Sequence, residues 1–522
     1  MYKNLLSVGG LTLLSRAAGF LRDVMLGAVL GAGLIADAFV VAQRLPNHFR
    51  AVFGEGAWNA AFVPTYSRAL QGEGLDTARR FSGQIFVGLL VIQLILLALA
   101  LLFTPTLIDL LAPGFRDEPE KFALTEALTR ITFPYLLFVT LVTLQSGALN
   151  AHGRFVAAAF APVLMNLSII AFLTVAFLFP NAGAAAAWGL MASGAMQLAL
   201  TSFAAWRAGI LEIFAWPRWS ADMRRFLAML GPAVIGSAGV QIALFADTII
   251  GSMLPTGGPS SIYYADRIYQ LPLGVIGIAA GTVLLPQMSR LVAAGRPEAA
   301  ISAQNRTFAI SLILTAPFFV AFLAIPDLIM RGVFLRGAFT PEAAQASAAV
   351  LAAYGLGILA VVLLRSAVPS FQAAGDTTTP MIAALVAVAG NVALKVVLFT
   401  PLGAPGLATA TSAGAWINLI LIAIFAMRRG LMKLDAQFMK VAACVAAGSA
   451  VLVIFALSAR APVTHLAQGA GRFSGEATLT LMTFGGASIY GLALIACLRL
   501  AGVRLRPLST RQSPKARPND PA

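Results

Sequence analysis

The sequence predicts an all-α protein that crosses a membrane many times, with about 14 transmembrane helices. Two observations carry this prediction. Hydrophobic residues make up 59% of the 522 residues and charged residues only 11%. An average soluble protein is roughly 45–50% apolar and about 25% charged, so a soluble enzyme and a nucleic-acid-binding protein are both excluded. In addition, apolar runs of about 20 residues, the length of a bilayer span, recur along the chain.

Each expected span is an apolar run bounded by Gly, Pro or charged residues. The runs cover 5–30, 34–67, 82–104, 126–150, 156–179, 184–206, 228–253, 261–290, 308–326, 343–371, 379–400, 406–427, 437–458 and 478–500. Between the sixth and seventh runs, residues 211–227 combine tryptophans with arginines and are expected to form an amphipathic helix at the membrane surface. The tail 503–522 is basic and rich in proline, which predicts disorder.

The chain repeats itself. A Pro-Thr-Tyr-Ser-Arg motif at Pro64 is echoed by Pro-Gln-Met-Ser-Arg at Pro286, and the small turn at Gly153 by the one at Gly375, each pair 222 positions apart. We therefore expect two homologous six-helix lobes with two additional helices. The predicted divisions are an N-lobe (1–210), an interfacial linker (211–227), a C-lobe (228–430), two extra helices (431–502) and the tail (503–522). Two lobes around a central cavity are the architecture of an alternating-access transporter.

The loops between the spans carry an uneven charge. If the N-terminus is inside, the inside loops hold most of the loop arginines and lysines, among them Arg79, Arg224, Arg296 and Arg428. The positive-inside rule then predicts that both termini are cytoplasmic. The net charge of +15 is explained by these loops and does not indicate nucleic-acid binding.

Arginines inside the spans are the candidate substrate contacts. A charge at bilayer depth is costly and normally faces a cavity or a partner. Arg16 and Arg22 lie in the first span, Arg50 in the second and Arg267 in the eighth. Guanidinium forks bind phosphate with two hydrogen bonds, so these residues suit a phosphate or diphosphate. An alternative stays open, in which the charges pair internally: Arg22 with Asp23 or Asp37, Arg44 with Asp37, and Arg267 with Asp266.

Polar neighbours of these arginines are candidate gate or orienting residues. They are Ser15, Asp23, Asp37, Asn47, Glu55 and Asp266. A second group, Asp247 with Asn391 and Lys395 at i, i+4, is a possible coupling site. It could bind a coupling cation, or Lys395 could replace that cation as a fixed positive charge, or Asp247 and Lys395 could form a static salt bridge. Arg365, near the end of the tenth span, is expected to snorkel.

Catalytic and metal-binding motifs are missing from the sequence. It contains no ATP-binding P-loop, no H-E-x-x-H and no G-x-S-x-G pattern. Its two cysteines, Cys444 and Cys497, lie singly in apolar runs. We therefore expect a transporter without a cofactor or a metal rather than an enzyme.

Several motifs resemble the MurJ (MviN) lipid II flippase family of the MOP exporter superfamily. They are SRAAGFLRD (15–23), ADAF (36–39), RLPN (44–47), FGEGA (53–57), AFVP (61–64) and YADRIYQLPLG (264–274). The resemblance implies transport of lipid II, the undecaprenyl-diphosphate-linked muropeptide, between leaflets of the bacterial inner membrane. It carries the family's essential arginines onto Arg16, Arg22, Arg50 and Arg267, with Asp37 and Glu55 as acidic partners.

The resemblance also implies that the last two helices form a groove for the polyprenyl tail. Members proposed to bind sodium have an acidic residue one turn after the asparagine of the eleventh span, where this chain has Lys395. The expected ligands are thus lipid II and membrane lipids. Protein partners from cell-wall synthesis would fit this function, although no motif identifies one. The alternatives are export of another lipid-linked oligosaccharide, and drug or cation antiport, which this many arginines disfavour.

Overall fold

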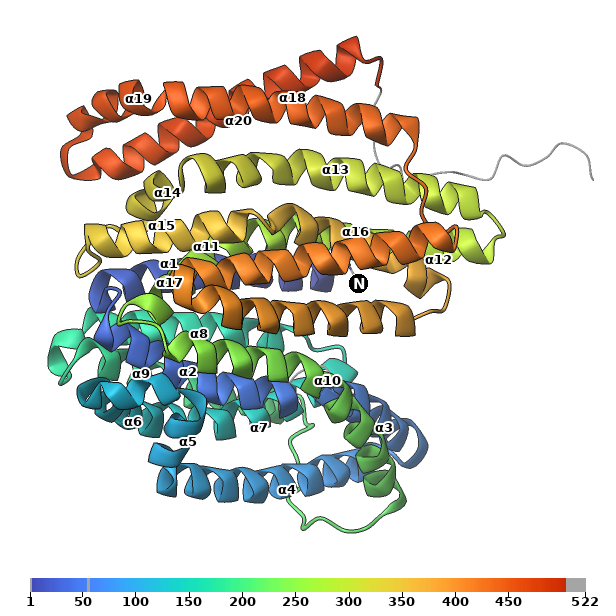
Figure 1. Ribbon diagram of the computed structural model, residues 1–522. Coiled ribbons are helices and arrows are strands. Elements are labelled where there is room, and N and C mark those ends of the chain that lie inside the picture. Colours follow the sequence, from blue (N-terminus) through green and yellow to red (C-terminus); the bar gives the residue numbers. More distant parts are fainter. Residues whose placement is uncertain (1, 54–56, 504–522) are drawn as a thin grey trace, which may run out of the picture.

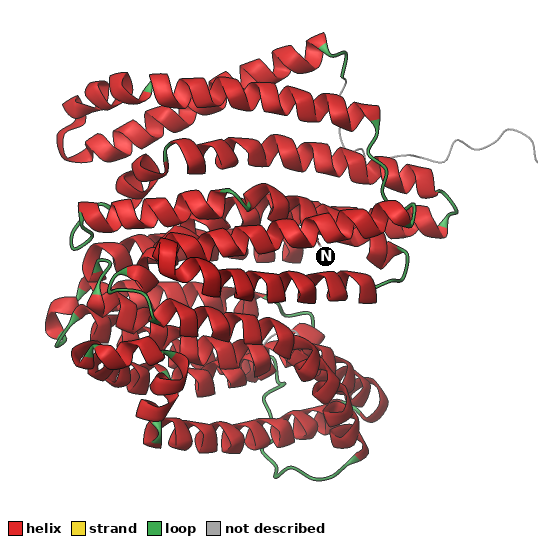
Figure 2. Cartoon of the chain, viewed as in Figure 1, coloured by secondary structure: helices red, strands yellow, loops and turns green. Residues whose placement is uncertain are grey.

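The computed structural model describes residues 2–53 and 57–503. Within these ranges every regular element is a helix and no strand occurs, as Figure 2 shows. The predicted all-α fold is therefore confirmed. Eight helical segments are long and apolar enough to cross a membrane by themselves. Further spans carry charges, or are interrupted by breaks in the helix.

The described residues of the first half form nine α-helices. They are α1 (Tyr2–Leu30), α2 (Leu34–Phe53), α3 (Ala57–Glu73), α4 (Leu75–Leu102), α5 (Thr104–Leu111), α6 (Pro119–Thr132), α7 (Tyr135–Ala151), α8 (Val156–Thr174) and α9 (Ala182–Arg207), with the short 3-10 helices η1 (Pro113–Asp117) and η2 (Ala176–Leu178). The expected second span corresponds to α2 and α3. The fourth corresponds to α6 and α7, which are separated at Pro134 because proline cannot continue the hydrogen-bond ladder.

The second half forms the remaining helices. They are α10 (Ala221–Ser252), α11 (Gly258–Pro272), the π-helical segment η3 (Leu273–Gly277), α12 (Ile278–Ala293), α13 (Pro297–Ala324), α14 (Pro326–Phe334), α15 (Pro341–Gly355), α16 (Ile358–Ala373), α17 (Thr378–Arg428), α18 (Ala436–Ser458), α19 (Arg460–Ala467), η4 (Gln468–Phe473) and α20 (Ser474–Leu500). Two expected spans, 379–400 and 406–427, are the two arms of α17. The chain reverses between them at Gly403, whose positive φ of 58° favours glycine.

The long helices run back and forth along one axis (Figure 1). At one edge of the bundle, α18 and α20 pack together and against α13 through a cluster that includes Ala316, Val445, Tyr490 and Leu494. Their outward side chains are large and apolar, for example Phe484 at 70% exposed. Such a surface suits lipid rather than water.

The bundle has two ends, and we name each by a residue that lies there. The Gly31 end contains the turns and loops 31–33, 253–257 and 335–340. The Arg79 end contains 73–74, 152–155, 208–220, 294–296, 374–377 and 429–435.

The linker between the halves differs from its prediction. Residues 211–220 form no helix, and α10 begins at Ala221. The expected helix over 211–227 is therefore wrong for its first ten residues. Two local features explain this: the Ile213 N–H donates to the Arg79 carbonyl of α4 (3.2 Å), and Pro217 has no N–H for a helical ladder. Gly83 of α4 allows the close approach, because a side chain there would collide with the Ile213 carbonyl.

Candidate functional site

Arg22 is held inside the bundle by three hydrogen bonds to two neighbours. Its Nε and Nη2 donate to Oδ1 of Asp23 (3.0 and 2.7 Å), and its Nη1 donates to Oδ1 of Asn166 on α8 (2.9 Å). The Asn166 amide in turn donates to the Ser15 carbonyl (3.0 Å). Arg22 and Asp23 are both buried. One internal ion pair that the sequence left open, Arg22 with Asp23, is thus present.

The same carboxylate connects the two halves of the chain. Oδ1 of Asp23 also accepts a hydrogen bond from the Tyr263 hydroxyl of α11 (3.0 Å). The guanidinium of Arg267 lies over the Tyr263 ring, with its Cζ atom 4.9 Å from the ring centroid. Arg267 pairs with Asp266 (3.2 Å), which also accepts from Gln270. Four predicted residues, Arg22, Asp23, Asp266 and Arg267, therefore form one cluster, which we call the arginine cluster.

Tyr263 is a member that sequence reasoning missed. It precedes Arg267 by four residues and so lies on the same helical face. That spacing was visible in the sequence, although nothing in it indicated that the Tyr263 hydroxyl would bind Asp23 of the first half. The Nε atom of Arg267 is buried without a hydrogen-bond partner in the described part of the chain.

Arg44 of α2 lies beside this cluster. It interacts electrostatically with Asp266 and with Tyr354 of α15, and Tyr354 also interacts with Asp247. The predicted second-half residue Asp247 and Arg44 therefore have Tyr354 as a common neighbour. Arg44 contributes positive charge without an ion pair in the described ranges.

The remaining first-half predictions have different outcomes. Arg16 is exposed on α1, with its guanidinium against Gly274 of η3. Asn47 lies half-buried on α2. The side chain of Arg50 and the whole of Glu55 lie outside the described residues, so their predicted roles stay predictions.

Asp37 joins the halves at the Gly31 end. Its carboxylate accepts from the backbone N–H groups of Gly257 (2.7 Å) and Ser260 (2.8 Å), which begin α11. A helix N-terminus favours a carboxylate because its N–H groups are unpaired and its dipole is positive there. Lys121 of α6 pairs with the same carboxylate (3.2 Å) and donates to the Thr256 hydroxyl (3.1 Å). We call Asp37, Lys121 and the start of α11 the clamp.

Lys121 is the second residue that sequence reasoning missed. It lies between the expected spans 82–104 and 126–150, yet its side chain is 0% exposed. Asp37 pairs with this lysine rather than with Arg22 or Arg44 in the described part of the chain. Close by, the Thr256 hydroxyl donates to Glu118, and this hydrogen bond is the main cause that lowers the pKa of that carboxyl. A single lysine near a span end carries no sequence signal of burial.

The possible coupling site is partly assembled. Lys395 is buried and its Nζ donates to Asp247 of α10. Asn391 lies one turn before Lys395 on α17, and its side-chain oxygen is buried without a partner among the described residues. Among those residues, no group of three or more His, Cys, Asp or Glu side chains could hold a metal ion.

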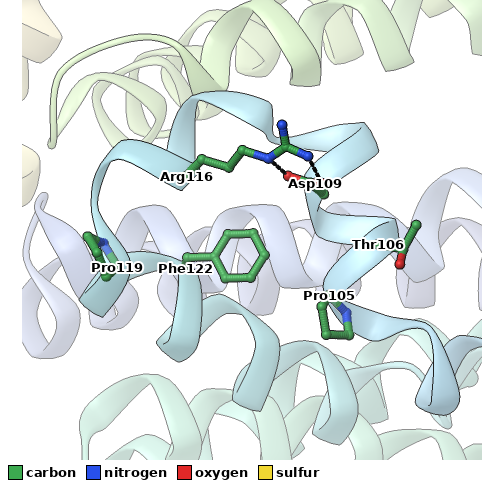
Figure 3. A pocket seen from close by; sticks show the side chains of 6 residues that line it. All are labelled: Pro105, Thr106, Asp109, Arg116, Pro119 and Phe122. Carbon is green, nitrogen blue, oxygen red and sulfur yellow. Dashed lines mark hydrogen bonds and ion pairs between the residues drawn. The ribbon is translucent and has the colours of Figure 1, made fainter.

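A separate cavity of about 390 Å³ lies at the Gly31 end between α5, η1 and α6 (Figure 3). Its lining residues are Pro105, Thr106, Asp109, Arg116, Pro119 and Phe122. The Arg116 guanidinium points at Asp109 and pairs with it. Its charge is therefore compensated, and no predicted site residue lines this cavity.

Comparison with known proteins shows that the chain is similar to the members of one family. A sequence model described as lipid II flippase MurJ matches residues 26–475. A probable lipid II flippase MurJ of Rhizobium meliloti (strain 1021) is 43% identical over 82% of this chain and 81% of that protein. A probable lipid II flippase MurJ of Rhizobium tropici is 38% identical over 88% of this chain and 87% of that protein.

Solved structures with the same fold are also found. A lipid II flippase MurJ in an inward closed conformation has a TM-score of 0.78 at 24% identity, covering 95% of this chain and 99% of that one. An inward-facing multidrug resistance MATE family transporter of the MOP superfamily has a TM-score of 0.62 at 14% identity, covering 80% and 95%. At these identities the likeness shows the fold alone.

Proposed function

The chain belongs to the lipid II flippase MurJ family, and we propose that it moves lipid II from the inner to the outer leaflet of the bacterial plasma membrane by alternating access. It is a multi-pass membrane protein and a transporter rather than a catalyst. The proposal is supported by the sequence relatives and by the charges of the arginine cluster.

The observation that carries the proposal is the arginine cluster. Arg22 comes from the first half of the chain and Arg267 from the second, and both contact the Asp23–Tyr263 pair within membrane-spanning helices. Arg44 adds a further positive charge. A bidentate guanidinium binds a phosphate or diphosphate more specifically than an ammonium does. A cationic drug would be repelled by the same charges, which disfavours antiport of drugs or cations.

Opening at the Gly31 end would release the substrate. The Asp37 carboxylate links α2 to the start of α11, so the halves cannot separate at this end without breaking its two backbone hydrogen bonds. We infer that the clamp is the outer gate. The Arg79 end then faces the cytoplasm, together with both termini, in agreement with its basic loops. The lobe boundaries predicted from the sequence belong to the same proposal.

The lipid tail needs an apolar surface beside the site for the diphosphate. The last two helices, α18 and α20, supply one because their outward faces are apolar and they attach to the rest of the bundle through α13. We assign the polyprenyl chain to this surface.

Energy coupling is proposed to involve Lys395. The ammonium lies against Asp247, where it would repel a bound sodium ion. We infer that Lys395 serves as a built-in cation and that transport depends on membrane potential or on a proton. Flipping should therefore continue in sodium-free vesicles with an imposed potential. Strict dependence on sodium would contradict this role, and an unchanged activity of Lys395→Met would contradict any role of the ammonium in coupling.

The test of the function is depletion of the protein in its own cells. Lipid II should then accumulate on the inner leaflet while its synthesis continues. Restoring the wild-type chain should relieve the accumulation, and restoring Arg267→Gln at equal abundance should not. Normal delivery of lipid II after depletion would contradict the proposal, and an accumulating lipid-linked oligosaccharide of another kind would favour the related exporter function instead.

A further inference from the structure

Two arginines lie against the π-helical segment η3, outside the arginine cluster. The guanidinium of Arg16 on α1 contacts Gly274, and the side chain of Arg365 on α16 contacts Gly277. A Cβ atom on Gly277 would lie 2.6 Å from Cδ of Arg365, and one on Gly274 would collide with Arg16. Glycine weakens a helix by about 1 kcal/mol relative to alanine. At these two positions it leaves room for an arginine.

Neither arginine has a counter-charge among the described residues. In the part of the chain that the structure describes, Arg16 and Arg365 form no ion pair and no hydrogen bond, and both side chains are exposed. Gly274 and Gly277 are three residues apart within the π-helical segment, so the two arginine side chains approach the same turn of one helical segment. Two uncompensated guanidinium groups at bilayer depth are costly, and they become favourable when an anion lies between them.

The direction of the Arg365 side chain argues against a snorkelling role. Gly281 lies opposite the backbone carbonyl of Arg365, whereas Gly277, one turn nearer the Gly31 end, lies opposite its side chain. The side chain therefore runs away from the Arg79 end, to which its residue lies closer. A snorkelling arginine would extend toward the nearer membrane surface.

We propose that Arg16 and Arg365 form a second anion subsite for a phosphate or diphosphate group, between the Arg79 end and the arginine cluster. Arg267 precedes Gly274 by seven residues, or about 10 Å of helix rise. One diphosphate group does not span that distance, so the two places bind it one after the other. The inference rests on the proposed function, in which an anionic headgroup enters from the Arg79 end and advances to the arginine cluster.

The experiment titrates a short-chain prenyl diphosphate into the purified full chain in phosphatidylcholine nanodiscs, followed by calorimetry. Wild type should show two binding events. Arg365→Gln and Gly277→Ala should each remove one event and keep the other, since the added Cβ displaces the arginine without removing it. Gly281→Ala is the matched control on the same helix. Its Cβ would meet only an ordinary 3.6 Å contact, so both events should remain.

A variant of the arginine cluster separates the two claims. Arg267→Gln should remove the event that Arg365→Gln keeps. If both events survive in Arg365→Gln and Gly277→Ala, the second subsite is refuted and the proposed function stands. A single event that both arginine variants weaken also refutes it, because the residues would then share one site. If wild type binds no prenyl diphosphate, the proposed function fails as well.

Bulk lipid is the other source of phosphate groups. Repeating the titration in nanodiscs that contain phosphatidylglycerol distinguishes it from cargo. If the event that depends on Arg365 persists, the subsite selects the diphosphate. If phosphatidylglycerol removes this event from wild type and leaves the remaining event of Arg365→Gln unchanged, the anion subsite is supported and its occupant is an anionic lipid headgroup.

Discussion

The Gly31 end and the Arg79 end join the two halves of the chain by different physical means. At the Gly31 end the contact is charged and buried, with Asp37 bound to the first turn of α11 and to Lys121. At the Arg79 end the contact is apolar, where Phe226 of α10 packs edge-on against Trp58 of α3 at 5.1 Å.

This difference bears on how each end can open. Hydrogen bonds from α11 to a carboxylate hold over a narrow range of distance and angle, so the clamp is either made or broken. Apolar contact is non-directional, and helices can slide while keeping much of it. The Gly31 end therefore behaves as a two-state gate, and the Arg79 end as a surface that adjusts gradually.

The largest effect should follow Asp37→Asn. The variant leaves the buried Lys121 ammonium with only the partly exposed Glu118 carboxylate, at 3.4 Å, as an ion-pair partner. Removing one partner of a buried pair costs about 3–5 kcal/mol. We expect a lower thermal unfolding midpoint and an opened Gly31 end. A cysteine at Ser261, a buried position beside the clamp, should become labelled in a cysteine-free background, whereas it stays protected with Asp37 intact.

Asp109→Asn is the matched control for this variant. Asp109 pairs with Arg116 at the same end, but Arg116 is largely exposed, so the pair contributes only about 0–1 kcal/mol. Labelling at position 261 should not change. Adding Lys121→Met to Asp37→Asn should recover part of the stability, because no buried charge then remains. Protection of position 261 in Asp37→Asn would show that other contacts hold the gate.

A smaller effect is expected between the two ends, for Arg267→Lys. The charge is retained but the planar fork is lost, so flipping should fall at least about tenfold, or about 1.4 kcal/mol. Labelling at position 261 should match wild type, since the clamp is untouched. Arg154→Lys, at an exposed position of the Arg79 end, serves as the control. Full flipping activity in Arg267→Lys would indicate that only positive charge matters.

At the Arg79 end we expect a still smaller change for Phe226→Leu. The variant keeps an apolar side chain and loses the ring contacts to Trp58 and Phe81, at a cost of about 1 kcal/mol. The thermal midpoint should fall slightly while labelling at position 261 stays at the wild-type level. Labelling that rose as much as in Asp37→Asn would abolish the distinction between the ends.

The comparison also separates what the sequence could predict from what it could not. Spans follow from apolar length, so the number of helices and even the two arms around Gly403 were predictable. The pairing of Arg22 with Asp23 was predictable because the residues are neighbours. The links between distant elements were not: Asp23 with Tyr263 and Asp37 with Lys121 depend on helix packing, which periodicity alone does not determine.

The linker shows a further limit. Tryptophans and arginines over 211–227 have the composition of an interfacial helix, and composition does not reveal a backbone hydrogen bond to α4. That bond, together with the small Gly83, holds residues around Ile213 in a non-helical path against α4. Long-range backbone contacts of this kind override local helix propensity.

The smallest predicted effect concerns the pH dependence of this linker. Glu212 is buried beside Gln145, whose amide donates to it at 3.3 Å. Burial raises the pKa of Glu212 above its usual value, although the hydrogen bonds and the Arg79 charge oppose the shift. The folded linker therefore prefers the protonated carboxyl. Its attachment is strongest below the unfolded-state pKa near 4.5 and weakens as pH rises through the raised value.

Hydrogen exchange of residues 208–220 should thus be slower at pH 5 than at pH 8, after correction for intrinsic rates, and Glu212→Gln should remove most of this difference. His152 contacts Tyr66 nearby, and its protonation has the opposite effect on the stability of this end. Burial and Arg154 lower the pKa of His152, so its protonation in acid disfavours the folded end. His152→Gln should therefore enlarge the effect of Glu212. A pH difference that persists in Glu212→Gln would assign the dependence to another group, and the linker would then be held by its backbone contacts with α4 alone.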